Sequence, residues 1–300
     1  MTAILILISA CLYGVSPILA KIAYTYGVTP LVLMTWRVTI AAALLWTVGL
    51  AFRRITPVEG RMAAALVALG ATLVPAQVFS YFYALSLLPA STASVIVNTA
   101  PIHVAWMERL ALGEQMARGD LVILGAIIAG ALLVAGSTPQ AGHTVGFMVL
   151  GGATLASAFY LVVQRRLVRD VPPLMVLAII QASSAAVYWV AILLTGQSLT
   201  RLPLPAFAAI VTSALVATVA SFLVLMALRT LAATRTAMLG MLEPVVTVVL
   251  SVLLLADRMT WPRLSGIAIV LAGITIFYWR LRQPGVVAPR ASDGEGFGAL

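Results

Sequence analysis

The chain has 300 residues, of which 62% are hydrophobic and only 9% are charged. A soluble domain carries about 25% charged residues because its surface must face water. The composition therefore excludes an ordinary soluble protein and predicts an all-α integral membrane protein. The net charge of +9 does not indicate a nucleic-acid partner, because the basic residues lie in short clusters between long apolar blocks.

The apolar blocks are long enough for membrane spans, each of which needs about 20 residues. Charged residues, prolines and glycines between them delimit ten helices. We predict spans at residues 2–24, 31–52, 62–86, 90–110, 119–137, 145–166, 173–195, 205–228, 233–255 and 262–281. The remaining segment, 282–300, is rich in glycine and proline and is predicted to be a disordered cytoplasmic tail.

The basic residues are distributed unevenly between the two sides of the predicted bundle. Thirteen fall in the even-numbered loops and the C-terminal segment, and five fall on the opposite side. By the positive-inside rule both termini are expected in the cytoplasm. Lys21 and Arg37 belong to the smaller group and are interpreted as side chains that reach the headgroups from the outer ends of their spans. A gate contact with a substrate carboxylate is the alternative for both.

The chain repeats itself at an ungapped offset of 143 residues. The matched positions include prolines, a glycine and an acid: Pro101 with Pro244, Gly130 with Gly273, and Glu114 with Asp257. Each half holds five predicted spans, an odd number, so the second half enters the membrane from the other side. We therefore predict two inverted five-helix repeats, 1–143 and 144–281. Such repeats are typical of alternating-access transporters with a site at the midplane between the halves.

Several short motifs carry a resemblance to a known family. They are Leu242-Glu243-Pro244, Asp257 and Gly266–Gly273 in the second half, echoed by Ala100-Pro101, Gly113-Glu114 and Gly125–Gly130 in the first. On these residues the chain resembles the drug/metabolite transporter superfamily (EamA-type, ten transmembrane helices). It looks most like the bacterial inner-membrane exporters of aromatic and other amino acids, which also export methyl viologen.

The resemblance implies a central cavity between the third, fourth, eighth and ninth helices. It also implies walls contributed by the first and sixth helices, with the fifth and tenth at the periphery. One departure from the repeat concerns the acid: Ala100 stands where the second half has Glu243, so any acidic role there is unpaired.

Polar and aromatic groups inside the spans are the candidates for substrate binding, because polar groups are costly in hydrocarbon. The candidate substrate-binding residues are Gln77, Phe79, Tyr81, Tyr83, Ser94, Asn98, His103, Trp106, Tyr160, Met238 and Glu243. Ser94 and Asn98 share one face of the fourth predicted helix, whereas His103 and Trp106 lie on another, and the spacing does not decide which faces the cavity.

Pro75, Pro101 and Pro244 are the candidate hinges, since each removes a backbone donor and strains the preceding turn. Glu243, beside Pro244, is expected to bind a substrate ammonium or a coupling proton, or else to bond the backbone that the proline opens. His103 is a second candidate for proton transfer, with an ordinary hydrogen-bonding role as the alternative.

We predict a transporter that exports aromatic and other neutral amino acids, related amphipathic metabolites or organic cations by alternating access. A sugar-phosphate or nucleotide-sugar exchanger is the alternative within the superfamily, and a membrane enzyme or a channel is the alternative from another class. The expected surroundings are the lipid bilayer of a bacterial inner membrane and a small-molecule substrate, without cofactor or metal. A monomer is expected, with a dimer as the alternative. The sequence does not decide whether transport is coupled to protons or is facilitated diffusion.

Overall fold

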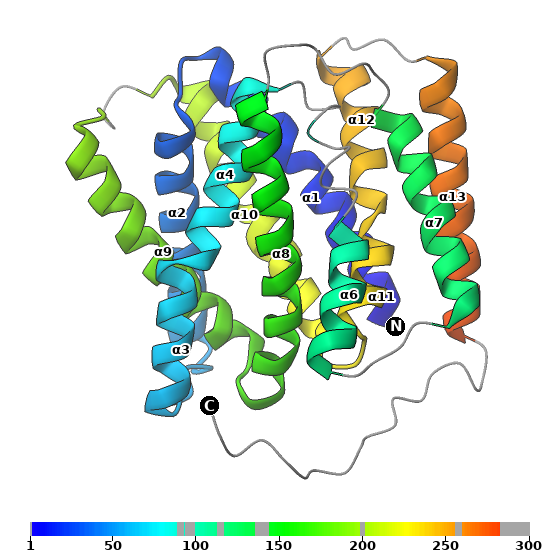
Figure 1. Ribbon diagram of the computed structural model, residues 1–300. Coiled ribbons are helices and arrows are strands. Elements are labelled where there is room, and N and C mark those ends of the chain that lie inside the picture. The colour runs from blue at the N-terminus through cyan, green and yellow to red at the C-terminus, as the bar shows by residue number, and fades with distance from the viewer. Residues whose placement is uncertain are drawn as a thin grey trace.

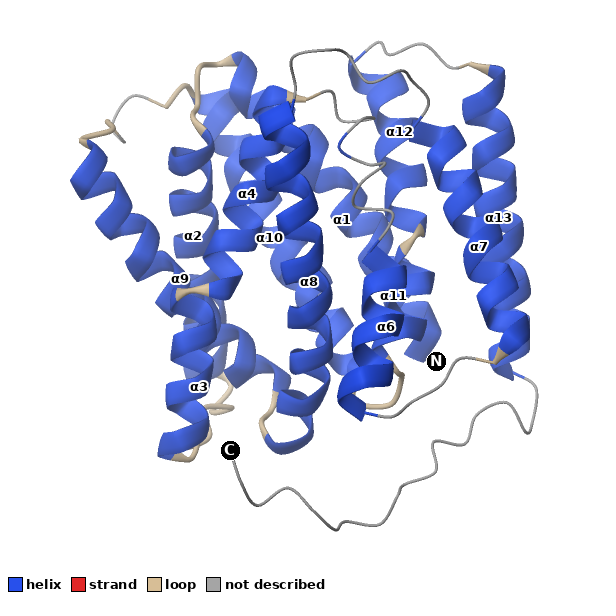
Figure 2. Cartoon of the chain, in the orientation of Figure 1, coloured by secondary structure: helices blue, strands red, loops and turns tan. Residues whose placement is uncertain are grey.

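The computed structural model describes residues 2–88, 93, 100–112, 117–135, 144–198, 202–255 and 260–282. The described part of the chain is helical and contains no strand, as the composition predicts (Figure 2). The helices are α1 (Thr2–Thr25), α2 (Pro30–Ala51), α3 (Gly60–Ala71), α4 (Leu73–Leu87), α6 (Ala100–Leu112), α7 (Arg118–Ala135), α8 (Thr144–Asp170), α9 (Pro173–Thr195), α10 (Leu204–Leu228), α11 (Ala233–Gly240), α12 (Leu242–Leu255) and α13 (Trp261–Arg282).

Seven of the described helical segments are long and apolar enough to cross a membrane, and Leu264–Arg280 is a shorter apolar helix. The count of ten spans stays a prediction, since residues 89–92 and 94–99 of the fourth expected span lie outside the described residues. The tail 283–300 also lies outside them, while Arg282 still belongs to α13.

Helix boundaries follow from local chemistry. At the start of α2, the Thr29 hydroxyl accepts a hydrogen bond from the Val32 amide at 3.3 Å, and Pro30 occupies the first turn. At the end of α9, Gly196 adopts a left-handed conformation with φ of 64°, which a glycine adopts without strain.

The spans expected at 62–86 and 233–255 each remain one candidate membrane span, but each consists of two helices separated by a break. The first break is at Thr72, between α3 and α4, and the second is at Met241, between α11 and α12. Each lies three residues before a proline, Pro75 or Pro244. A proline ring clashes with the carbonyl four residues earlier and offers no amide, so the helix breaks in the turn before it.

The helix contacts repeat when the two halves are exchanged. The packing of α1 on α10 corresponds to that of α8 on α4, and α1 on α12 corresponds to α8 on α6. The contacts of α2 with α9 and of α7 with α13 map onto themselves. In Figure 1, α1 begins at the lower edge of the bundle and α8 begins at the upper edge, so the two halves start from opposite ends.

The pair α7 and α13 stands at one side of the bundle (Figure 1), where the resemblance places the fifth and tenth helices. Gly130 allows this close contact, because a Cβ atom there would meet Ile269 at 2.8 Å and the Gly266 carbonyl at 3.0 Å. The small residues of these two helices therefore mediate packing within the chain.

Candidate functional site

A cavity of about 410 Å³ lies inside the bundle, within the range of roughly 300–1,000 Å³ typical of small-molecule sites. Its wall is formed by residues of α1, α2, α4, α6, α8, α9, α10, α11 and α12. Both helix breaks border it, because Val74 and Pro75 line it on one side and Met241 and Pro244 on the other. The cavity is thus enclosed by the segments where the backbone departs from regular helix.

Several predicted residues do lie on this wall. Of the candidate substrate-binding set, Gln77, Tyr81, Tyr160 and Glu243 line the cavity. So do the three candidate hinges, Pro75, Pro101 and Pro244.

The other described candidates lie elsewhere. Trp106 and Tyr83 are 59% and 37% exposed on the outside of the bundle, and Phe79 stacks on Tyr83 with ring centroids 5.9 Å apart. Met238 is fully buried in an apolar cluster. His103 is not part of the described lining, and its buried Nδ1 has no hydrogen-bond partner among the described residues. Ser94 and Asn98 lie outside the described residues.

Arg37 lies on the cavity wall, so the expected headgroup contact is not found, whereas the alternative of a contact with a substrate carboxylate stays open. It lies two turns inside α2, lines the cavity, and is not at an outer end of the bundle facing headgroups. Its guanidinium carbon stands 4.8 Å from the centre of the Phe82 ring, a cation–π contact that holds the charge at the cavity wall. Lys21 is also not simply a headgroup contact, since its ammonium donates to the Leu88 carbonyl at 3.1 Å.

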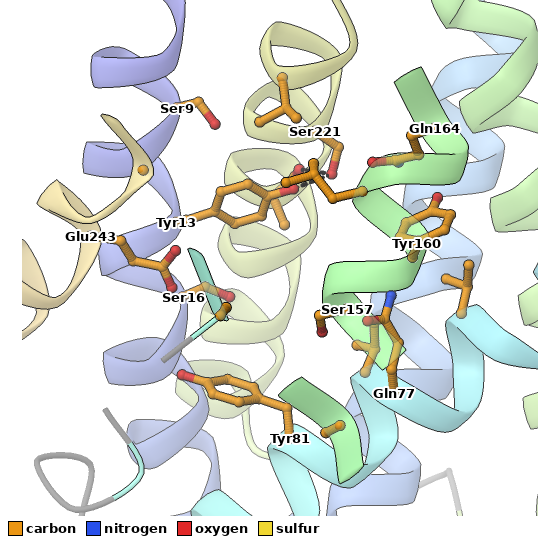
Figure 3. Close-up of a pocket in the computed structure, with 18 of the residues that line it drawn as sticks. Ser9, Tyr13, Ser16, Gln77, Tyr81, Ser157, Tyr160, Gln164, Ser221 and Glu243 are labelled. Atoms are coloured by element: carbon orange, nitrogen blue, oxygen red, sulfur yellow. Dashed lines mark hydrogen bonds between the residues drawn. The ribbon is translucent and has the colours of Figure 1, made fainter. Parts of the chain in front are cut away.

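The resemblance implies that the first helix contributes to the wall, but the polar residues of α1 that line the cavity were not among the candidates. Ser9, Tyr13 and Ser16 follow one another at spacings of four and three and therefore share a face that lines the cavity. Tyr13 reaches across to α10, where its hydroxyl lies 2.6 Å from that of Ser221 (Figure 3). The same rule that found Gln77 on α4 would have found this stripe, because it also consists of polar groups inside an apolar span.

Glu243 enters the cavity from the first turn of α12, opposite the side that carries Gln77, Ser157 and Tyr160 (Figure 3). Its side chain makes no hydrogen bond within the described residues. The hydroxyl of Thr247 is the donor to the Glu243 backbone carbonyl, at 3.1 Å, and it also lies 3.1 Å from the Gly14 carbonyl. The Glu243 carboxylate therefore makes no hydrogen bond to the described backbone next to Pro244.

The polar groups of the wall divide into two classes. One class is already bonded to the protein: Ser9 to the Ala220 carbonyl, Ser16 to Ser213, Ser184 to the Gly70 carbonyl and Tyr188 to the Pro75 carbonyl. The other class has no hydrogen bond to an oxygen or nitrogen of the described protein and includes Arg37, Gln77, Tyr81, Ser157, Gln181, Thr236 and Glu243. The second class consists of the groups that are available to a bound molecule.

Comparisons with known proteins agree with this architecture. A search of the curated proteins finds no significant match. A solved structure described as "Crystal structure of protein" superposes with a TM-score of 0.78 at 19% identity, covering 92% of this chain and 98% of that one. The model of the EamA-like transporter family matches twice, at residues 1–136 and 144–279, once for each half of the repeat. A family model that covers nearly the whole chain settles membership, and the protein belongs to the EamA-like transporter family.

Proposed function

We propose that the protein exports neutral amino acids across a bacterial cytoplasmic membrane by alternating access. The observation that carries the substrate class is the presence of one cation and one carboxylate, Arg37 and Glu243, on the wall of a single cavity. Within the described residues no ion pair of 4 Å or less joins them. A free α-amino acid is a zwitterion and carries the complementary pair of charges.

The head of the substrate binds between these two groups in this proposal. The planar guanidinium of Arg37 matches a carboxylate through two parallel hydrogen bonds, and the carboxylate of Glu243 accepts from the ammonium. Charge-assisted bonds of this kind contribute about 1.5–3 kcal/mol each. Both charges are costly in a membrane interior unless they are paired, so the substrate supplies the missing partner to each.

The side chain of the substrate then points to the opposite wall. Gln77, Ser157 and Tyr160 present amide, hydroxyl and aromatic groups there, opposite Glu243 (Figure 3), and Gln181 lines the same cavity. Aromatic rings stack or meet edge to face with tyrosine, and hydroxyl or amide side chains bond to glutamine. Aromatic and other neutral amino acids are therefore the preferred class.

The alternative substrates fit the wall less well. A sugar phosphate or nucleotide sugar needs several basic groups, and Arg37 is the single Lys or Arg in the described lining. An organic cation such as methyl viologen would be attracted by Glu243 but repelled by Arg37, so we rank it below the amino acids. The direction of transport rests on the family resemblance, and alternating access is supported by the helix breaks at Thr72 and Met241.

The test combines transport with binding. Purified protein in liposomes is given labelled phenylalanine, tryptophan, threonine or methyl viologen, with and without a pH gradient. Binding of phenylalanine, its methyl ester and N-acetylphenylalanine is measured by the rise in Tm of the protein in detergent. We expect saturable uptake of the amino acids and a rise in Tm with phenylalanine that exceeds the rise with either analogue.

Two variants assign the charges. Arg37→Gln is expected to weaken phenylalanine binding about tenfold or more and to remove the discrimination against the ester. Glu243→Gln is expected to do the same for the N-acetyl analogue, and also to remove any stimulation of uptake by the pH gradient. Arg61→Gln and Glu59→Gln, exposed residues outside the lining, are the matched controls. Folded protein that neither binds nor transports any of the amino acids would overturn the proposed substrate class.

A further inference from the structure

Three helices meet at a buried ion pair near the end of the bundle where α1 begins and α13 ends (Figure 1). Arg165 of α8 donates from Nη1 to Oε1 of Glu108 on α6 at 2.6 Å, and the two side chains are 7% and 3% exposed. The same carboxylate accepts the backbone amides of Ala233 at 2.7 Å and Thr234 at 2.9 Å, in the first turn of α11. We name these four residues the Glu108 cluster; one carboxylate in it joins α6, α8 and α11.

The Glu108 cluster lies directly beyond the cavity. Val104 of α6, Gln164 of α8 and Thr236 of α11 line the cavity, and each stands within one helical turn of a member of the cluster. The three helices that form part of the wall are thus tied together where they leave it. No residue of the cluster itself is on the described cavity lining.

The surroundings of the ion pair are apolar. Val104 belongs to the same buried cluster as Val168 of α8, Leu225 and Leu228 of α10, and Ala233 of α11. Glu108 and Arg165 are themselves 3% and 7% exposed, so buried side chains fill the space between the cavity and that end of the bundle.

We propose that the Glu108 cluster is the gate of the transport pathway at the end of the bundle where the described chain begins and ends. The cavity opens toward that end when Glu108 separates from Arg165 and from the first turn of α11. This inference rests on the proposed alternating-access function, of which it specifies one gate, but it does not depend on which substrate is carried.

A buried ion pair suits a gate for an energetic reason. Removing two charges from water costs about as much free energy as their attraction returns, so such a pair is near balance with its hydrated, separated state. A purely apolar seal would favour the closed state, because opening it exposes apolar surface to water. The ion pair instead leaves the closed and open states close in free energy, which a transporter needs in order to cycle.

The gate is also linked to the charged part of the cavity. α11 is tied to the Glu108 cluster at its first turn and is separated from α12 by the break at Met241. Glu243 stands two residues after that break. Movement of α11 about Met241 therefore connects release of Glu108 to the environment of Glu243.

The test measures access to the cavity from each side, without any substrate. The exposed Cys11 is first removed by Cys11→Ser. Ala237→Cys is then introduced, which places a single thiol on the cavity wall beside the gate. A membrane-impermeant thiol reagent is applied to inside-out and right-side-out vesicles, and the rate of labelling is measured. We expect Glu108→Gln and Arg165→Gln each to raise labelling from the gated side by about tenfold or more, because the open state becomes more populated. Labelling from the other side is expected not to rise.

Asp120→Asn provides the matched control. It breaks a second acid–arginine pair, between Asp120 of α7 and Arg280 of α13 at 3.2 Å, which lies outside the cavity lining. It is expected to leave both labelling rates unchanged. Arg165→Lys, a milder change that keeps the charge, is expected to give a smaller increase than Arg165→Gln.

Either of two results would overturn the gate: no increase in any folded Glu108 or Arg165 variant, or an equal increase in Asp120→Asn. Because the readout uses no substrate, neither result would touch the proposed amino-acid class, which the binding measurements decide separately.

Discussion

Gly14 is a residue of α1 that packs closely against α12 beside the acidic group of the cavity. A Cβ atom at this position would lie 2.7 Å from the Val246 Cβ and 2.9 Å from the Glu243 carbonyl oxygen. Neither the Cβ atom of Val246 nor the backbone carbonyl of Glu243 can move aside without a shift of the α12 backbone. The glycine thus fixes the distance from α1 to the segment that carries Glu243.

We predict that Gly14→Ala lowers transport severalfold in protein that still folds, because α12 must shift and take Glu243 with it. Overpacking of this kind costs about 1–3 kcal/mol. The measurement is uptake in liposomes alongside Tm. Gly152→Ala in α8, where a new Cβ meets nothing within 4 Å, is expected to leave uptake unchanged. Wild-type uptake in Gly14→Ala would show that the spacing beside Glu243 does not matter.

At this scale the sequence predicts part of the site. Gln77 and Glu243 are identified because a polar group inside an apolar span must have a reason to be there. The headgroup contact expected for Arg37 is not found, because distance from a span end does not reveal which way a side chain turns. The orientation of α2 depends on packing against α9 and α10, residues that are distant in the chain. Trp106 and Tyr83 fail for the same reason, since an aromatic ring suits lipid as well as a cavity wall.

Among the elements, the break between α3 and α4 shows how an interrupted helix is supported. Side chains of α9 bond the backbone on both sides of the break: Ser184 donates to the Gly70 carbonyl at 2.7 Å and Tyr188 donates to the Pro75 carbonyl at 2.8 Å. Backbone groups inside a membrane must be satisfied by some partner, and here neighbouring side chains supply it. The sequence does not reveal that α9 supplies these bonds, because α9 is distant from the hinge in the chain.

We predict that Ser184→Ala lowers the free energy of unfolding by about 1–3 kcal/mol, since a buried carbonyl loses its partner. The measurement is thermal unfolding in detergent. Ser183→Ala is the control, because the Ser183 hydroxyl bonds only the Ile179 carbonyl of its own helix. A Tm of Ser184→Ala equal to that of the control would mean that the break at Thr72 does not need this bond.

For the whole molecule, the repeat is the feature that the sequence predicts best. Matched prolines, glycines and acids at one offset indicate two units, and the family model matches each unit once. What pattern alone does not provide is how the units interlock. The contacts of α1 with α10, α2 with α9, α4 with α8 and α7 with α13 all join one half to the other.

These contacts give the last prediction. Because the principal helix contacts cross between halves, neither half can bury its own apolar faces, and each needs the other to fold. A chain cut within residues 136–143 and expressed as two fragments is expected to assemble when both are made together. An affinity tag on one fragment should then recover the other in about equal amount, with a single unfolding transition. Either fragment expressed alone is expected to be degraded or aggregated. A first half that is stable by itself would contradict this, since it would show that contacts within a half suffice to hold five helices together.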